Sequence, residues 1–516
     1  MFRACRSLKR LRNILRTLAR YDALFPLERA GLNHKLVKTL QRMAMIKQRP
    51  SPDCLGKSPG QRLALAFTAL GPVFIKLGQA LSVRRDLVGD EMARELSSLQ
   101  DRLPPFPAAH AKAMIESEFQ KPLENIFSSF SDKPVAAASI AQVHLAITTD
   151  GNPVAVKVLR PGIEQAFFQE LDLIGWIGEL IERVFPKYRR LRLPDTINVI
   201  GRTIHQEMDL RMEAAAGDEL RNNFIGDKDF YVPSIDWERT SRRVLTLERI
   251  EGLQINNIQG LLKAGHDREV ILANLARIFF LQVFRDGFFH ADLHPGNMFI
   301  SNDGKIQVVD FGIMGRIDSR TRYYLAEMLL GFLNHDYDRV ADVHFQAGYV
   351  PPDQSHQAFA QAARAIAKPI FGRSLQDISL AHLLSQLFDV TERFNMQTQP
   401  QLILLQKTML VAEGVGRDLN PETNMWELAR PLIDDWVAEN MTAEAQAAEF
   451  AVEASKILKR LPFILSKIEE NIELLDCTRH SQGSKDPQSV GGRAIQPSFF
   501  YWGAAAGLAI LALLTI

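Results

Sequence analysis

This sequence of 516 residues has little cysteine and little net charge, and both shortages exclude classes of protein. Its three cysteines, Cys5, Cys54 and Cys477, are too scattered for a zinc-binding spacing or a disulfide framework. This usage is typical of a reducing compartment. The formal net charge is +1, so no global electrostatic attraction to nucleic acid is expected. The length exceeds that of one ordinary domain.

Long uncharged apolar runs are also scarce, and the clearest one is the segment 499–516. It contains no charged residue, and Phe499, Phe500, Tyr501 and Trp502 give it an aromatic entrance. As a helix it would span about 27 Å, close to the roughly 30 Å of a bilayer's hydrocarbon core. The polar linker 476–497 separates it from the body, which disfavours a buried core helix. We predict a single transmembrane helix at 499–516, with the body on the side where it is made.

The N-terminal residues 1–24 lack an acidic residue before Asp22 and are rich in arginine. Leu8, Leu11, Leu15 and Leu18 recur at helical spacing, which predicts a basic amphipathic helix. Such a helix can lie on an anionic membrane surface or pack its leucine face on the body. A mitochondrial presequence is a less favoured alternative.

The chemistry of the chain is concentrated in two motifs, His-Ala-Asp-Leu-His-Pro-Gly-Asn at 290–297 and Asp-Phe-Gly at 310–312. Phosphoryl transfer from ATP needs a carboxylate to orient the attacking hydroxyl and oxygen ligands for Mg²⁺. Both motifs have the form found in protein kinases. We predict Asp292 as the catalytic-loop carboxylate and Asn297 and Asp310 as Mg²⁺ ligands, with ATP or ADP as the nucleotide.

A predicted β-hairpin upstream supplies a candidate lysine. Two strand-like runs flank Asp150-Gly151-Asn152, a favourable hairpin turn. The second run, Val-Ala-Val-Lys at 154–157, matches the kinase strand whose lysine contacts the α and β phosphates. A lone lysine on a strand is usually an exposed edge residue, but the motifs downstream favour Lys157 as a catalytic residue.

The sequence lacks the Gly-x-Gly-x-x-Gly loop with which kinases cover the phosphates. The corresponding segment at 136–141 is Ala-Ala-Ala-Ser-Ile-Ala. Each β-carbon restricts the backbone, so we predict a stiffer loop that holds the nucleotide differently or more selectively. The predicted nucleotide-binding residues of this segment are Ala136, Ala137, Ala138, Ser139, Ile140, Ala141, Gln142, Val143 and His144.

Kinases orient the strand lysine through a glutamate on a neighbouring helix, here predicted from about 194 to 222. Glu207, Asp209 and Glu213 all lie on it, and their spacing does not choose among them. Residues 243–248 then predict the strand that enters the hinge between two lobes. The backbone groups of Glu248 and Ile250 are predicted to contact adenine.

The sequence also lacks an Ala-Pro-Glu segment after Asp-Phe-Gly. Residues 318–475 are predicted to be helical throughout, with a break at 348–352. Further helices are predicted within 21–106 and at 111–131, 161–184 and 268–287. A groove for a protein substrate is therefore not supported.

The assembled motifs resemble the UbiB family of atypical kinase-like proteins over roughly residues 60–350. The resemblance rests on Lys-x-Gly-Gln at 76–79, the Ala-rich segment, Glu-x-Asp at 207–209 and the loop at 290–297. It departs from the family at Ala141, where many members have Gly. The resemblance implies an α+β, protein-kinase-like two-lobe fold with a helical N-terminal extension.

In that fold the Lys-x-Gly-Gln segment lies over the active site. The resemblance implies a regulatory role for Lys76, Gln79, Glu207 and Asp209, in which Lys76 meets the two acids. It also suggests Glu213 as the partner of Lys157.

The expected domains follow from these motifs. They are a basic helix at 1–24, a helical extension at 25–131, an N-lobe at 132–252, a mostly helical C-lobe at 253–475, a linker at 476–497 and a transmembrane helix at 499–516.

The family resemblance implies a role in ubiquinone biosynthesis at a membrane, as an ATPase or a small-molecule or lipid kinase. Expected partners are membrane lipids and either ubiquinone-biosynthesis enzymes or polyprenyl-phenol intermediates, with no nucleic acid. The expected location is the bacterial inner membrane, with the body in the cytoplasm; the mitochondrial inner membrane is less favoured.

Two alternatives remain. A phosphotransferase of the aminoglycoside or choline kinase type shares a similar loop at 290–297 but lacks the 76–79 and Ala-rich motifs. A nucleotide-binding pseudokinase scaffold is disfavoured because no catalytic residue is missing.

Overall fold

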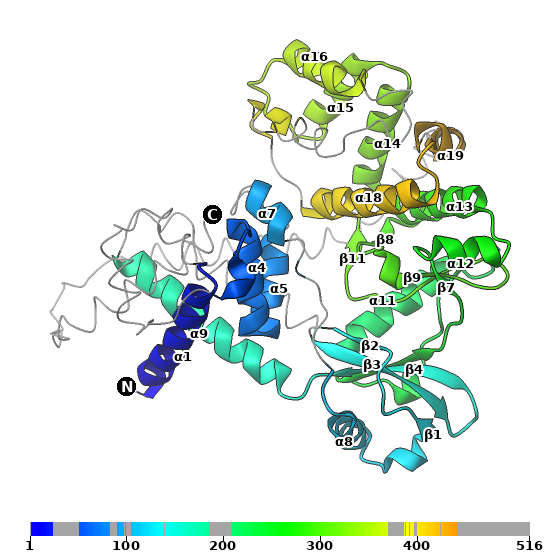
Figure 1. Ribbon diagram of the computed structural model, residues 1–516. Helices are drawn as coiled ribbons and strands as arrows, with labels where there is room; N and C mark the ends of the chain where they lie inside the picture. The colour runs from blue at the N-terminus through cyan, green and yellow to red at the C-terminus, as the bar shows by residue number, and fades with distance from the viewer. Residues whose placement is uncertain are drawn as a thin grey trace, which may run out of the picture.

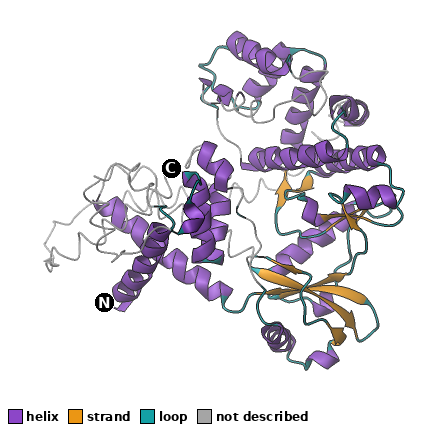
Figure 2. Cartoon of the chain, viewed as in Figure 1, coloured by secondary structure: helices purple, strands orange, loops and turns teal. Residues whose placement is uncertain are grey.

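The structure is a computed structural model in which the strands gather at the lower right of the view, with helices to their left and above them (Figures 1 and 2). It describes residues 2–23, 51–82, 90–96, 99, 105–138, 140–184, 208–369, 386, 389–391, 393–396, 400–423 and 425–440. Within these residues, no helix combines the length and apolar composition that crossing a membrane requires. The predicted segment 499–516, its linker, Ser139 and Glu207 lie outside the described residues.

The N-lobe is an antiparallel sheet with the strand order β1-β3-β4-β6, and β2 pairs with β3. Its strands are β1 (Phe127–Phe130), β2 (Ala136–Ala137), β3 (Ala141–Thr148), β4 (Pro153–Leu159) and β6 (Val244–Glu248). The predicted hairpin turn is present, and Gly151 has φ +87°, which favours glycine. The helix α8 (Ala108–Phe119) covers the outer face of the sheet through Ala111 and Ile115.

Two boundary predictions in this region are wrong. The helix predicted at 111–131 ends at Phe119, because Gln120 adopts a left-handed conformation and a short turn then leads into β1. The sheet therefore begins at Phe127, before the predicted domain boundary at 132. The described part of the helix predicted from about 194 to 222 is α11 (Leu210–Asn223), and residues 194–207 lie outside the described residues. Asp209 caps α11 by accepting a hydrogen bond from the Arg211 N–H.

The C-lobe contains two small sheets below the helix α13 (Arg268–Phe280). One has the order β5-β10-β9-β7 and the other pairs β8 with β11. These strands are β5 (Phe230–Tyr231), β7 (Leu253–Gln254), β8 (Phe288–His290), β9 (Met298–Ile300), β10 (Ile306–Val308) and β11 (Met314–Arg316). The apolar helix predicted at 268–287 changes into a π-helical turn at Leu281–Asp286. The short helix α12 (Ile258–Lys263) precedes α13.

Beyond β11 the described chain is helical, as the sequence predicts. The helices are α14 (Ser319–Leu333), α15 (Tyr337–Gln346), α16 (His356–Ala367), α18 (Pro400–Leu419) and α19 (Met425–Asn440). The predicted break falls after α15, where Gly348 has φ +72°. In Figure 1, α18 crosses next to β8 and β11, and α19 packs on α13 and α14.

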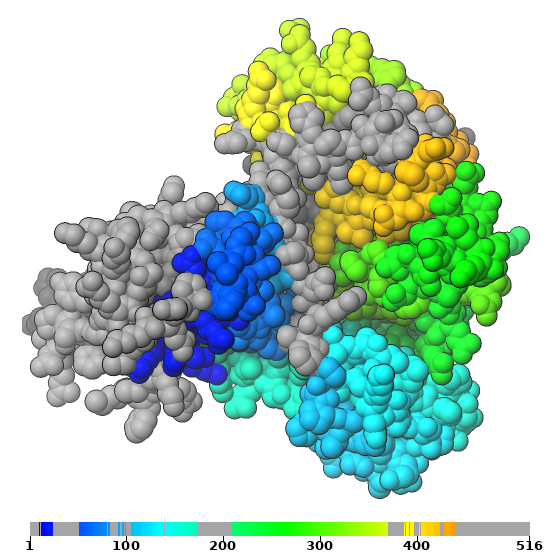
Figure 3. Space-filling model, in the orientation of Figure 1, coloured from blue at the N-terminus to red at the C-terminus, as the bar shows by residue number. Residues whose placement is uncertain are grey.

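The N-terminal extension consists of α1 (Phe2–Arg20), α4 (Pro59–Leu70), α5 (Pro72–Ser82) and α7 (Asp90–Leu96) beside the long helix α9 (Ile163–Val184). Ile14, Leu15 and Leu18 of α1 are buried, so this part of its apolar face packs on the body. In Figure 3 the extension (blue) lies to the left of the N-lobe (cyan).

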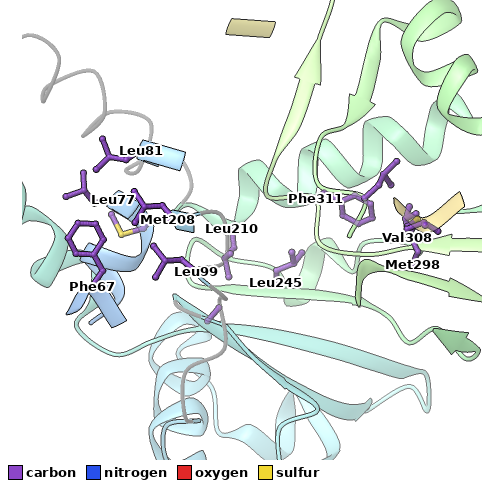
Figure 4. Packing of buried hydrophobic residues seen from close by; sticks show 14 of the residues in the cluster. Phe67, Leu77, Leu81, Leu99, Met208, Leu210, Leu245, Met298, Val308 and Phe311 are labelled. Atoms are coloured by element: carbon purple, nitrogen blue, oxygen red, sulfur yellow. The ribbon is translucent and has the colours of Figure 1, made fainter. Parts of the chain in front are cut away.

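One hydrophobic cluster connects the extension to the catalytic elements. Figure 4 shows Phe67, Leu77 and Leu99 beside Met208, and the cluster continues through Leu210 to Phe311. Its residues are almost fully buried. The extension is therefore part of the same core as the Asp-Phe-Gly segment.

Candidate active site

Three charged residues from three elements meet between the lobes. The Lys157 Nζ on β4 lies 2.7 Å from Glu213 Oε1 on α11 and 3.0 Å from Asp310 Oδ1 after β10. The side chains of Lys157 and Glu213 are 11% and 7% exposed, whereas Asp310 is 46% exposed. Asp310 is therefore the member of this cluster that a ligand can reach most easily.

The charges of the cluster shift one another's pKa values. Burial lowers the pKa of Lys157, but Asp310 and Glu213 outweigh this effect and raise it. Burial raises the pKa of Asp310, but the Lys157 charge outweighs it and brings the value down to about 2. Burial raises the pKa of Glu213 to about 7 despite the adjacent Lys157. A proton that enters this coupled cluster therefore goes to Glu213, and Asp310 stays anionic.

The strand register decides which predicted residues face this cluster. Val143 on β3 is paired with Lys157 on β4, so both point to the inner face of the sheet. Gln142 and His144 point to the other face and are fully buried. There the Gln142 amide pairs with the backbone of Phe106, at 3.0 and 3.2 Å. The side chains of Gln142 and His144 therefore face away from Lys157, and nucleotide binding at these two positions stays a prediction.

The Ala-rich segment is hydrogen-bonded to Arg160, the residue that follows β4. The Ala138 carbonyl accepts hydrogen bonds from Arg160 Nε and Nη2, at 3.1 and 2.9 Å. The Ala138 N–H also donates to the Ala141 carbonyl across a tight turn. Sequence reasoning missed Arg160, although its position directly after the lysine strand was a signal. These hydrogen bonds are a second feature, besides the β-carbons, that favours the predicted stiffness of the loop.

The catalytic loop is organised by a buried histidine. The His290 Nδ1 accepts from the Asp292 N–H at 3.1 Å, and Nε2 lies 3.2 Å from the Val309 carbonyl. Burial lowers the pKa of His290, so the ring is neutral with its proton on Nε2. Asn297 Nδ2 donates to the Asp292 carbonyl at 3.1 Å. Both predicted loop residues are therefore held by the loop itself.

Gln282, which the sequence analysis did not single out, forms a hydrogen bond with the backbone of this loop. Gln282, in the π-helical turn after α13, accepts the His290 N–H at 2.8 Å and is fully buried. The turn shifts the helix register by one residue, and such turns often occur at functional sites. Nothing in the apolar pattern of 268–287 distinguishes this glutamine.

The Asp-Phe-Gly segment has an unusual backbone. Asp310 adopts φ +63°, which is uncommon for a residue with a β-carbon. Phe311 is buried against Gly217 of α11, where a β-carbon would come within 2.6 Å of the ring. Gly217 and Glu213 both lie on α11. The packing of Phe311 on this helix therefore places the preceding residue, Asp310, close to Glu213.

The predicted hinge residues follow β6. The Glu248 carboxylate accepts from the Tyr231 hydroxyl at 2.7 Å and from Ser234. Burial, followed by this hydrogen bond, raises the pKa of Tyr231 to about 12. The Glu248 N–H donates to the Ser234 carbonyl, so the backbone N–H of Glu248 is already used within the protein. The contacts of Glu248 and Ile250 with adenine stay a prediction.

The residues predicted to be regulatory lie in different places in the structure. Burial raises the pKa of Asp310, and nearby cations lower it. The charge of Lys157 has the larger lowering effect and that of Lys76 a smaller one. Lys76 therefore lies close enough to interact electrostatically with Asp310. Gln79 Nε2 donates to the Leu99 carbonyl at 3.3 Å. Asp209 pairs with Arg211 and caps α11, while Glu207 lies outside the described residues.

A further cation reaches the loop from far along the chain. The Lys407 Nζ on α18 lies 3.1 Å from Asp292 Oδ1, across 115 positions of sequence. Sequence reasoning missed Lys407, because no local motif marks it. The site thus combines a buried lysine cluster with a second lysine at the catalytic-loop carboxylate.

Comparisons with known proteins agree with this geometry. Residues 98–344 match the ABC1 atypical kinase-like domain, and residues 363–424 match the UbiB helical domain. Fold and site define an atypical kinase, and the sequence prediction of this class is confirmed.

The chain belongs to the UbiB family. It is 46% identical to the "Probable protein kinase UbiB" of Marinobacter nauticus, over 74% of this chain and 71% of the relative. A protein of the same name from Shewanella piezotolerans is 39% identical, over 91% of this chain and 84% of the relative. A solved structure described as the Rv3197–erythromycin complex from Mycobacterium tuberculosis is 23% identical. It has a TM-score of 0.49 and covers 72% of this chain and 90% of that chain.

Proposed function

We propose that the chain is a membrane-anchored atypical kinase or ATPase that binds Mg-ATP and supports ubiquinone biosynthesis. The observation that carries the proposal is the contact of Lys157 with both Glu213 and Asp310. Phosphoryl transfer in kinases requires a strand lysine paired to a helix glutamate and an Asp-Phe-Gly carboxylate beside the phosphates. Lys157 would hold the α and β phosphates, and Glu213 would orient it.

Asn297 and Asp310 are the residues that would hold Mg²⁺. Because Asn297 donates its amide N–H to the Asp292 carbonyl, its Oδ1 remains to accept a metal. The low pKa of Asp310, about 2, keeps that carboxylate anionic at any physiological pH. Bound Mg²⁺ neutralises phosphate charge and takes most of its other ligands from phosphate and water. Hard oxygen groups of this kind suit the ion.

The acceptor in this proposal is water, a lipid or a small polyprenyl-phenol molecule. Between Gly312 and the start of α14 at Ser319 lies only the short strand β11, paired with β8. A long segment that could form a shelf for an extended peptide is not present in this part of the described chain. The relatives are named probable protein kinases, and transfer to a protein is the outcome that would contradict this proposal.

The proposed location is a bacterial inner membrane, with an anchor at 499–516 and the body in the cytoplasm. The uncharged composition of that segment and the bacterial source of the relatives support it. Proposed partners are membrane lipids and either ubiquinone-biosynthesis enzymes or their lipid intermediates.

The test is the ubiquinone content of a bacterial strain that lacks this chain. The strain would be complemented with the parent, with Asp310→Asn, and with a chain truncated before Phe499. We expect rescue by the parent alone, with the immunoblotted amounts of all three proteins matched. Full rescue by Asp310→Asn would instead assign the site a scaffolding role. Rescue by the truncated chain would remove the anchor from the proposal.

A further inference from the structure

The catalytic loop is contacted by a lysine from a different domain. Lys407 lies on α18, within the helical domain matched at 363–424, whereas Asp292 lies in the kinase-like domain matched at 98–344. Their ammonium and carboxylate groups are 3.1 Å apart, and each side chain is about one-third exposed, at 36% and 35%. The pair is therefore partly open to solvent and within reach of a ligand.

The position of Lys407 is fixed by packing on both sides of it in α18. Leu405 is buried in a cluster with Phe284 and Phe289, the latter on β8 directly before the loop at 290–297. Thr408 is fully buried, and its hydroxyl donates to the Leu404 carbonyl one turn back. In Figure 3 the surface of α18 (orange) is continuous with the C-lobe (green). Lys407 is therefore presented to the loop by a docked helix.

Stability does not account for this ion pair. A pair that is one-third exposed is screened by water, and such pairs contribute about 0–1 kcal/mol. The arrangement also places a cation where a phosphoryl group must pass to reach an acceptor oriented by Asp292. Lys157 is already held by two carboxylates deeper in the site. His294 of the loop uses Nδ1 to accept the Gly296 N–H.

We propose that Lys407 is a second phosphate-contacting residue of the active site, held by Asp292 in the resting state and contacting the γ-phosphoryl group as that group is transferred. The inference rests on the proposed function. In the transfer step an acceptor hydroxyl oxygen forms a bond to the γ-phosphorus, and the bond from that phosphorus to the ADP oxygen breaks. The hydroxyl proton passes to the Asp292 carboxylate. Lys407 stays protonated throughout and balances the charge on the transferred oxygens.

This role makes the helical domain part of the catalytic unit. Any movement that lifts α18 from β8 and β11 would remove a cation from the site and leave Asp292 without this partner. The kinase-like domain alone would then bind nucleotide through Lys157 and Asp310 but transfer phosphate slowly.

The experiment uses the full-length protein in detergent, with Mg-ATP as substrate. Phosphate release is measured for the parent, Lys407→Ala, Lys407→Met, Lys407→Arg and Gln406→Ala, an exposed neighbour on the same helix. ATP affinity is measured in parallel, and thermal unfolding shows which variants are folded. We expect kcat to fall about 10–1,000-fold in the Ala and Met variants, as for other preorganised groups that stabilise transition-state charge. ATP affinity should stay within about threefold of the parent, and Gln406→Ala should match it.

Lys407→Arg keeps the charge and should recover most of the lost kcat, which a purely structural role would not predict. A folded Ala or Met variant with kcat within twofold of the parent would overturn the inference. A loss confined to ATP affinity would also overturn it, because the contact would then not be specific to the transition state. If the parent neither binds nor hydrolyses ATP, the proposed function itself fails, independently of Lys407.

Discussion

Lys157 and Glu213 meet in the interior between the N-lobe sheet and α11, with 2.7 Å between Nζ and Oε1. Both side chains are nearly inaccessible to solvent, at 11% and 7% exposed. A buried ion pair is weak evidence for stability, although breaking one by removing a partner is strongly destabilising. The same ammonium also contacts Asp310, so the pair controls the position of the predicted metal ligand.

The first prediction concerns this pair. Glu213→Gln should lower the kcat for ATP by about 10–100-fold, because Lys157 would turn fully to Asp310 and misplace the phosphates. Steady-state phosphate release measures the effect. Glu219→Gln is the matched control on the same helix, since Glu219 pairs with Arg316 at the surface. Equal rates for the parent and Glu213→Gln would contradict the proposed orienting role.

The second prediction concerns pH. The Glu213 pKa is about 7 in the folded chain, above the ordinary value of 4.5. Between these two values the folded state binds a proton that the unfolded state has lost. The stabilisation from Glu213 is therefore complete below about pH 4.5 and is lost as the pH rises towards 7. Relative to Glu213→Gln, the free energy of unfolding of the parent should fall by about 1 kcal/mol per pH unit in this range.

Denaturant titrations of both proteins at pH 5 and pH 7 provide the measurement. Asp310 does not interfere, because its pKa of about 2 places its titration below this range. A parent that gains stability over the mutant between pH 5 and pH 7 would show that Glu213 is not the protonated member of the cluster.

The motifs of the catalytic machinery could be predicted from sequence because their residues lie within short segments. Asp292, Asn297, Asp310 and Lys157 each belong to a local pattern. The structure brings Lys157 to Asp310 and Asn297 to the Asp292 carbonyl. No local pattern indicated which of Glu207, Asp209 and Glu213 pairs with Lys157. That choice depends on where α11 begins, and Asp209 sets its start by capping the helix.

Other contacts depend on segments distant in sequence and could not be predicted. Lys407 lies 115 positions from Asp292, and Gln282 acts through a π-helical turn that apolar periodicity does not reveal. The motif also did not predict which face of the sheet the side chains of Gln142 and His144 occupy. It follows from the strand register and from the docking of Phe106 on the outer face.

The third prediction concerns Gly78 of the Lys-x-Gly-Gln segment. A β-carbon at this position would lie 2.2 Å from Leu99 and 2.7 Å from Phe67, in the core that joins the extension to the active site. Gly78→Ala should therefore destabilise the chain by about 1–3 kcal/mol, as overpacked cores do. Gly414→Ala on α18 is the control, because nothing lies within 4 Å of its β-carbon. That variant should gain about 0.5–1 kcal/mol.

Chemical denaturation of both variants measures these opposite shifts. If Gly78→Ala proved as stable as the parent, the close approach of α5 to Leu99 would not be present in solution. Reduced stability together with a changed rate of ATP turnover would indicate that the extension and the site share one core, as Figure 4 shows.

The last prediction concerns the stiffness of the Ala-rich segment. Arg160 donates two hydrogen bonds to the Ala138 carbonyl, and a lysine keeps the charge but lacks this planar fork. Arg160→Lys and Ala138→Gly should therefore both loosen the loop and change the ratio of ATP to ADP affinity in the same direction. Calorimetric titration of each nucleotide with Mg²⁺ measures the ratio, and Lys263→Arg on α12 is a charge-preserving control away from the segment. Ratios equal to that of the parent in both variants would show that loop stiffness does not select the nucleotide. If the affinity ratio changed in Ala138→Gly alone, the β-carbon of Ala138 would be the restraint on the loop and Arg160 would not contribute to it.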